Sequence, residues 1–420
     1  MPDGVSGPPE VIEELRPTRW PVALRSLRYR DFRLFWIGMV ISVIGTWMQN
    51  AAQGWLVLEL TNSALYLGIV GACGSLPMLL FALPAGVVAD RCVKQHVLLV
   101  TQTLSMLQAF VLAALVHAGT VQVWHVMLLA ACLGSVNAFD MPTRQAMVMD
   151  LAGRDDILNA VSLNSLAFNS GRTIGPAVGG VLVAGVGMAG CFFINGLTFL
   201  AVIIALLLIP ARAPGGAVQA PFVTEMKGGL SWVRRNPIAM WLIALTAMSS
   251  LFAMPYTTLM PVFARDILHA GPRGFGLMLS ATGAGALVTG IVLTSQGHRF
   301  RLGALATAGS LAFPLGLMAV SFAPRFAIAL VALFLTGLGM MLFNVVSNTM
   351  LQKAPPDELR GRVMSVRTFF FAGLGPAGNL QIGAAGQWLG PRWAIAFGGV
   401  VCFLMAAVAW LRAPNLRQSK

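Results

Sequence analysis

The sequence predicts an all-α membrane protein whose twelve transmembrane helices form two pseudo-symmetric bundles of six. Three observations support this fold class. Of the 420 residues, 57% are hydrophobic and only 10% are charged, whereas soluble domains carry about 25% charged residues. Long uncharged runs separate the charges, and a helix crosses a bilayer with about 20 apolar residues. Residue patterns of the first half also recur in the second. This composition excludes an ordinary soluble enzyme and a disordered chain.

The first six helices follow from four uncharged runs. Runs 34–58 and 60–89 each hold one helix, and runs 95–139 and 173–211 are each long enough for about two crossings. The predicted helices span about 33–59, 65–89, 95–117, 123–147, 159–184 and 187–209.

The last six helices follow from one uncharged run each, beginning with 236–264 and ending with 393–411. The predicted helices span about 238–262, 274–295, 302–321, 325–350, 363–388 and 391–411. Because the total is even, both chain termini are expected on the same side of the membrane.

The longest connector divides the chain into halves. It begins with the flexible stretch PARAPGG and continues with TEMKGGLSWVRR, which predicts a short amphipathic helix at the membrane surface. The expected organisation is a cytoplasmic N-terminal segment 1–32, a six-helix bundle 33–209, a cytoplasmic linker 210–237, a second bundle 238–412 and a cytoplasmic tail 413–420.

The two halves match weakly but in the same order, which is typical of transporters whose halves rock against each other. The matches are Trp36 with Trp241, Asp155-Asp156-Ile157 with Asp357-Glu358-Leu359, and Gly175-Pro176 with Gly375-Pro376.

The net charge of +13 comes from basic residues whose distribution predicts the orientation of the chain in the membrane. Most basic residues lie in the termini and in the connectors on the same side, while the opposite connectors hold only Arg265, Arg273, Arg325 and Arg392. Positive residues stay in the cytoplasm, so both termini are predicted to be cytoplasmic. Nucleic-acid binding would need a basic patch on one face of a soluble domain, and the sequence offers none.

Three stretches carry a resemblance to a known family. They are Gly86-Val-Val-Ala-Asp90-Arg91-Cys-Val-Lys94, Gly171-Arg-Thr-Ile-Gly175-Pro176-Ala-Val-Gly179-Gly180, and NAFDMPTRQAMV at 137–148. Together they resemble the major facilitator superfamily over about residues 25–412. The second resembles the helix-5 signature of the family's proton-coupled antiporters. The third is similar to the branch that contains enterobactin exporters and macrolide efflux proteins. The first departs from the family's loop pattern at Val93, where that pattern has glycine.

The loop after the second helix is a candidate cytoplasmic gate. Asp90 and Arg91 lie where that helix leaves the membrane, between Gly86 and Lys94. An Asp at this depth can pair with an Arg of a neighbouring helix and hold the cytoplasmic side of the protein in one of its two states. The resemblance implies Arg144 as the partner. The alternative is a simple turn that anchors the topology.

The glycines of the fifth helix are Gly171, Gly175, Gly179 and Gly180. Small residues let helices approach closely, and Pro176 removes a backbone hydrogen bond and bends the helix. We expect a pivot and seal between the halves, with ordinary tight packing as the alternative.

Three ionisable residues lie within the predicted helices, away from the helix ends. They are Asp140 and Arg144, four apart on the fourth helix, and Arg172 on the fifth. An unpaired charge at the bilayer centre costs about 2.5–3.5 kcal/mol on insertion scales, so these residues should face the interior. A buried carboxylate can load and release a proton as its surroundings change, which makes the three candidates for proton coupling. The alternative is a static ion pair.

The resemblance implies that the first, fourth, seventh and tenth helices line a central substrate path. A lining of amides, aromatic rings and methionines suits an amphiphilic molecule of variable shape. For each amide, a helix–helix hydrogen bond is the alternative. The deep charges sum to +1, which favours neutral or anionic amphiphiles such as siderophore-like or macrolide-like compounds. The candidate lining residues are Gln49, Asn50, Gln53, Asn137, Phe252, Tyr256, Asn344 and Asn348.

These features predict a secondary transporter of a bacterial inner membrane, exporting a small molecule by proton antiport and alternating access. An importer of the same fold is the first alternative, and a multi-span lipid-acting enzyme is a remote one. The chain has no Gly-Lys dipeptide of a phosphate-binding loop, and its five scattered cysteines fit no metal site. We therefore expect no cofactor, metal, ATP or nucleic acid. The expected partners are a small-molecule substrate, protons and the bilayer.

Overall fold

The computed structural model describes residues 22–211, 222–296 and 301–413, and these residues are helical, without a strand among them. The predicted N-terminal segment up to residue 21, most of PARAPGG and the tail beyond 413 lie outside these ranges. The first half contains η1 (Val22–Arg28), α1 (Arg30–Thr61), α2 (Ala64–Arg91), α3 (Lys94–His117), α4 (Val123–Leu151), η2 (Arg154–Asp156) and α5 (Ile157–Leu208).

The second half begins with the amphipathic helix α6 (Phe222–Arg235), in the segment where the sequence predicts one. It continues with α7 (Pro237–Met248), η3 (Ser249–Ala253), α8 (Tyr256–Val262), η4 (Phe263–Ile267), α9 (Gly271–Gln296), α10 (Leu302–Ser321), α11 (Phe326–Lys353), α12 (Asp357–Gly373), α13 (Gly375–Trp388) and α14 (Pro391–Arg412).

The helices account for the twelve predicted crossings. In the described residues, ten helical stretches are long and apolar enough to span a bilayer. One of them, α5, has 52 residues and turns at Gly187, whose φ is 76°, so it supplies the fifth and sixth crossings. Helices α12 and α13 together cover the predicted eleventh crossing; the charged start of α12 lowers its hydropathy. The all-α, twelve-crossing fold class is confirmed.

The seventh crossing is less regular than predicted. It runs from Pro237 to Ile267 as two α-helical pieces with a π-helical segment after each. Pro255 and Pro261 lie in and beside α8, and a proline has no N–H for the helical ladder. The local widening keeps the remaining groups hydrogen-bonded while the helix bends.

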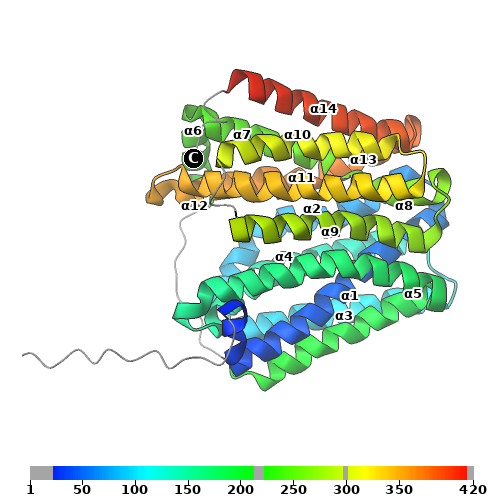
Figure 1. The fold of residues 1–420 in the computed structure, drawn as a ribbon. Helices are drawn as coiled ribbons and strands as arrows, with labels where there is room; N and C mark the ends of the chain where they lie inside the picture. The colour runs from blue at the N-terminus through cyan, green and yellow to red at the C-terminus, as the bar shows by residue number, and fades with distance from the viewer. Residues whose placement is uncertain (1–21, 212–221, 297–300, 414–420) are drawn as a thin grey trace, which may run out of the picture.

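The two halves lie side by side, and their long helices run roughly along one direction (Figure 1). Helix α1 packs on α5 and α2 on α4 in the first half, while α11 packs on both α9 and α10 in the second. Helix α1 begins and α14 ends at the same end of the molecule, at the left of Figure 1. We call this the terminal end, and the opposite end, which carries the turns at 118–122 and 389–390, the far end.

Two seams join the halves toward the far end, one between α5 and α9 and the other between α2 and α13. Glycines bring the backbones into direct contact there. A Cβ added at Gly180 would lie 2.7 Å from the carbonyl oxygen of Pro272, and one at Gly383 would lie 2.8 Å from the Cα of Gly68. These are closer than non-bonded carbon atoms can approach, so a larger residue would force the halves apart.

Polar contacts across the seams are few and involve neutral groups on at least one side. The Ser63 hydroxyl donates to Gln387 Oε1 at 2.8 Å, and the Arg265 guanidinium donates to the side-chain oxygen of Asn62. Each ion pair between fully described side chains lies within a single half. The seams therefore depend on backbone packing.

The short helix η1 is fixed to the terminal end by a buried carboxylate. Asp156 is 2% exposed and pairs with Arg25 at 3.2 Å and Arg28 at 2.9 Å. The Ser26 hydroxyl donates to the Asp156 carbonyl oxygen at 3.0 Å. These contacts attach η1 to the start of α5.

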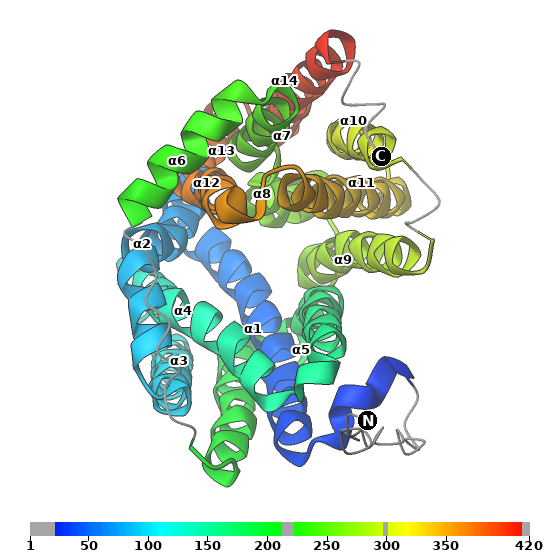
Figure 2. The same cartoon turned by 90° about the vertical axis from the view of Figure 1, so that its left-hand side faces the viewer.

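Helix α6 lies along the outside of the second half at the terminal end and packs on α12 (Figure 2). Its apolar residues Met226, Leu230, Trp232 and Val233 join the same cluster as α12. Gly228 and Gly229 face Arg362 of α12. The linker helix is thus attached to the eleventh crossing.

Candidate functional site

A cavity of about 400 Å³ lies between the two halves, within the usual size range of small-molecule sites. Both halves contribute to its walls, which are mainly apolar and aromatic with a few polar groups. The walls include Trp47, Asn50 and Gln53 of α1, Leu67 and Val70 of α2, Arg172 and Pro176 of α5, Tyr256 and Thr258 of α8, Phe275 and Thr282 of α9, and Met340 of α11.

A smaller pocket adjoins this cavity in the second half, and Met254 and Met340 line both spaces. Its other walls come from α7, α10, α11 and α12, and they include Asn344 and Arg367. The flexible methionine side chains form the boundary between the two spaces, so a bound molecule could reshape it.

The structure brings together only part of the predicted lining. Asn50, Gln53 and Tyr256 line the cavity, and Asn344 lines the adjoining pocket. Asn137, Phe252 and Asn348 are not among the lining residues of either space. The ring of Phe252 packs edge-on against Phe397, with centroids 6.1 Å apart.

Gln49 is placed away from the cavity, although it lies four residues before Gln53. It is 1% exposed, and its amide oxygen accepts from Asn195 Nδ2 at 2.7 Å while its Nε2 donates to Gln108 Oε1 at 3.0 Å. This is the helix–helix hydrogen bond that the sequence left open as the alternative. The amide joins α1, α3 and α5 within the first half.

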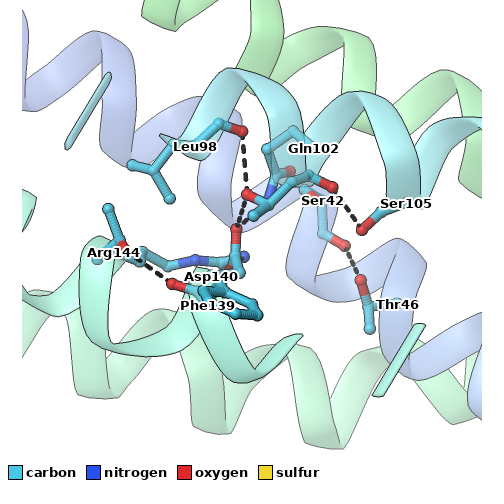
Figure 3. A network of polar contacts seen from close by, with 10 residues as sticks. Ser42, Thr46, Leu98, Gln102, Ser105, Phe139, Asp140 and Arg144 are labelled. Atoms are coloured by element: carbon cyan, nitrogen blue, oxygen red, sulfur yellow. Dashed lines mark hydrogen bonds and ion pairs between the residues drawn. The ribbon is translucent and has the colours of Figure 1, made fainter. Parts of the chain in front are cut away.

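Asp140 is buried inside the first half, 1% exposed, and three donors surround its carboxylate (Figure 3). Thr101 Oγ1 donates to Oδ1 at 2.9 Å, and Gln102 Nε2 donates to the same oxygen at 2.7 Å. Arg144, one turn further along α4, pairs with Oδ2. The ion-pair partner of Asp140 is therefore Arg144 of the same helix.

Arg172 lies apart from this pair and points into the cavity between the halves. Its Nη2 is 3.4 Å from Met340 Sδ, and its guanidinium carbon is 5.9 Å from the centre of the Trp47 ring. It forms no ion pair with a carboxylate of the described chain. The three predicted coupling residues therefore occupy two separate places.

The predicted pairing of Asp90 with Arg144 is not present in this structure. Asp90 is half-buried at the end of α2 and forms none of the described ion pairs. Arg144 pairs instead with Asp140 on its own helix, because residues four apart face each other without bringing two helices together. Lys94 pairs with Asp150 at 2.5 Å, Arg91 is exposed, and a Cβ at Gly86 would meet nothing within 4 Å.

The glycines of α5 face two different neighbours. Gly171, Gly175 and Gly179 lie against α1 of the same half, while Gly180 lies against α9 of the other. The carbonyl of Pro176 also faces α9, beside Gly276. Spacing of four places the first three residues on one helix face, and the next residue, Gly180, turns toward the seam.

Sequence reasoning missed Arg367 of α12. Its side chain is 8% exposed, and its Nη2 donates to Asn344 Oδ1 at 3.0 Å and to the Asn344 carbonyl at 3.3 Å. The guanidinium carbon lies 5.5 Å from the centre of the Phe371 ring. The available signal was a charge inside the predicted helix 363–388, masked by the nearby Arg360 and Arg362.

Comparison with known proteins identifies the family. The family model described as transmembrane secretion effector matches residues 22–419. The chain belongs to this family of the major facilitator superfamily. Staphyloferrin A transporter of Staphylococcus aureus is 28% identical to this chain, over 83% of the chain and 87% of the relative. Multidrug efflux pump Tap of Mycolicibacterium fortuitum is 26% identical, over 81% and 85%.

Macrolide efflux protein A of Streptococcus pyogenes is a further relative, 22% identical over 81% of this chain and 86% of the relative. The predicted branch of the superfamily is thereby confirmed. Among solved structures, the nucleoside transporter NupG (D323A mutant) superposes with a TM-score of 0.75 at 12% identity, covering 93% of this chain and 99% of that one. At that identity the likeness shows the fold alone.

The described site combines two kinds of group. The cavity offers an apolar and aromatic space with amides and a guanidinium that has no described ion-pair partner. A separate carboxylate is enclosed by hydrogen-bond donors within the first half. The cavity has the size and lining that suit an amphiphilic small molecule.

Proposed function

We propose that this protein is a secondary active exporter of small amphiphilic molecules, driven by proton entry and working by alternating access. The observation that carries the proposal is the cavity between the halves. The close contacts of the two seams lie toward the far end of the molecule. A site at the interface of two such halves becomes accessible from either side as they rock.

The distribution of positive residues supports an orientation with the terminal end in the cytoplasm of a bacterial inner membrane. In that orientation the seams close the outer side and the cavity is positioned to load from the cytoplasm. The names of the relatives, which include a macrolide efflux protein and a siderophore transporter, support export of compounds of these kinds.

Asp140 and Arg144 are the proposed coupling pair. Protonation of Asp140 would remove the negative charge that pairs with Arg144. The Arg144 side chain would then be released, and the terminal end of α4 could rearrange. Arg144 would then be available to other acids there, among them Asp90, which forms no ion pair with a described side chain.

Transport into inside-out vesicles tests the proposal. Vesicles with an acidic interior should accumulate a radiolabelled macrolide or staphyloferrin A against its gradient, and a protonophore should abolish that accumulation. Accumulation that survives the protonophore would exclude proton coupling. Uptake into right-side-out vesicles under an inward proton gradient would instead identify an importer.

A further inference from the structure

We propose that the cavity binds a carboxylate group of its substrate between the guanidiniums of Arg172 and Arg367, one from each half. This inference rests on the export function proposed above and narrows its substrates to anionic amphiphiles.

The two guanidiniums, which come from opposite halves, contact the same helix, α11. Arg172 of α5 lines the central cavity, and Arg367 of α12 lines the adjoining pocket. Arg172 is 3.4 Å from the sulfur of Met340, and Arg367 is 3.0 Å from the side-chain oxygen of Asn344. Met340 and Asn344 are four apart on α11, where the Cβ atoms of such residues are about 5–6 Å apart. The guanidiniums therefore contact adjacent turns of one helix.

Neither guanidinium has a counter-ion in this structure. None of the described residues that line the two spaces is Asp or Glu, and neither arginine takes part in a described ion pair. Asp140, the buried acid of the first half, is already occupied by Thr101, Gln102 and Arg144. The two positive charges thus have no described counter-ion, Arg172 in the cavity between the halves and Arg367 in the adjoining pocket of the second half.

The present partners of the two arginines are all uncharged groups. Arg172 has a thioether sulfur and the face of an indole ring, and the buried Nε of Arg367 has no hydrogen-bond partner at all. A charged side chain inside a membrane protein is costly, and such residues mark ligand pathways. The planar guanidinium fork matches a carboxylate with two parallel hydrogen bonds, so a substrate carboxylate would supply the missing partner.

The rest of the site fits the remainder of such a molecule. Trp47, Phe275 and Leu279 give the cavity apolar walls, and Asn50 and Gln53 offer amides. Because the two arginines belong to different halves, an anion between them would also draw the halves together around the substrate. Separation of the halves would then weaken its binding.

A matched pair of fluorescent probes tests the inference on the purified full-length protein in lipid nanodiscs. Pyrenebutyrate and pyrenebutyramide share one apolar body and differ in the charged group. We expect the acid to bind about tenfold tighter or more, because hydrogen bonds to ionised groups are the stronger ones. Arg172→Gln and Arg367→Gln should each remove most of this preference. Arg360→Gln, an exposed arginine paired with Asp357, is the matched control and should keep it.

The wild-type comparison needs no variant, so the inference stays testable if a glutamine variant does not fold. Equal binding of the two probes, weaker binding of the acid, or no binding of either would overturn it. A preference that persists in both Arg172→Gln and Arg367→Gln would also overturn it. If the preference is absent but a macrolide is exported uphill, the inference fails and the proposed function stands. If the preference is present but nothing is transported, the function fails and the anion site stands.

Discussion

Asp140 is the residue on which the coupling proposal depends, and its surroundings allow a clean substitution. Asp140→Asn keeps the shape and can still accept from Thr101 and Gln102, but it cannot ionise. We expect this variant to lose accumulation driven by a pH gradient while it keeps downhill exchange, because the rocking movement does not itself need the charge. Transport in reconstituted vesicles measures both activities.

Asp357→Asn is the matched control for that experiment, since Asp357 is exposed and pairs with Arg360 on its own helix. It should accumulate substrate like the wild type. Unchanged pH-driven accumulation in Asp140→Asn would show that the Asp140–Arg144 pair is structural, and the proton would then use another acid or the substrate itself.

For single residues, the sequence predicts the burial of polar side chains better than it predicts their orientation. The Asp140–Arg144 pair could be anticipated because its spacing is local to one helix. Gln49 and Arg367 could not be placed, since the neighbours that decide their orientation, Gln108, Asn195 and Asn344, come from other helices. Contacts with residues that are distant in sequence cannot be deduced from the residue spacing within a single helix.

Among the elements, α5 offers a matched pair of glycines for testing the seam. Gly180 touches α9, whereas a Cβ at Gly185 on the same helix would meet nothing within 4 Å. Gly180→Leu should prevent closure of the far end and abolish transport, since overpacking a tight contact costs about 1–3 kcal/mol. Gly185→Leu should transport normally. Flux per molecule, with membrane expression measured in parallel, separates the two; equal flux would show that the seam tolerates opening.

The attachment of η1 to the start of α5 gives a second prediction at the scale of elements. Asp156→Asn should release η1, because loss of a buried ion pair costs about 3–5 kcal/mol and partial exposure of the two arginines reduces that cost. We expect trypsin to cleave after Arg25 and Arg28 about tenfold faster. Asp155→Asn, at the exposed neighbouring position, should leave the cleavage rate unchanged, and equal rates in the two variants would contradict the attachment.

The boundaries of the elements follow the sequence closely where a charge or a turn ends an apolar run. They depart from it where the backbone itself changes course. The π-helical segments of the seventh crossing and the break between α12 and α13 occur inside apolar stretches. Hydropathy does not predict such changes in the backbone, because the residues before and after each one face the same lipid or protein surroundings.

For the whole molecule, the proposed orientation can be tested with two single cysteines. Ser231 is exposed on α6 at the terminal end, and Thr120 is exposed in the turn between α3 and α4 at the far end. The exposed native Cys92 and Cys132 are first replaced by serine. In intact cells an impermeant maleimide should label Thr120→Cys and spare Ser231→Cys until the membrane is permeabilised. The reverse pattern would invert the topology and the direction of transport.

The composition of the seams has a consequence for how the molecule responds to its medium. Salt screens the attraction between charges, with a screening length of about 10 Å at 0.1 M. At the seams, glycine backbones touch, and each ion pair between fully described side chains stays within one half. Salt therefore has few interactions to weaken there. The contribution of the seams to the balance between the two alternating-access states should therefore stay nearly constant from dilute to concentrated salt. Distances between spin labels on α2 and α13, measured across that range, would report it.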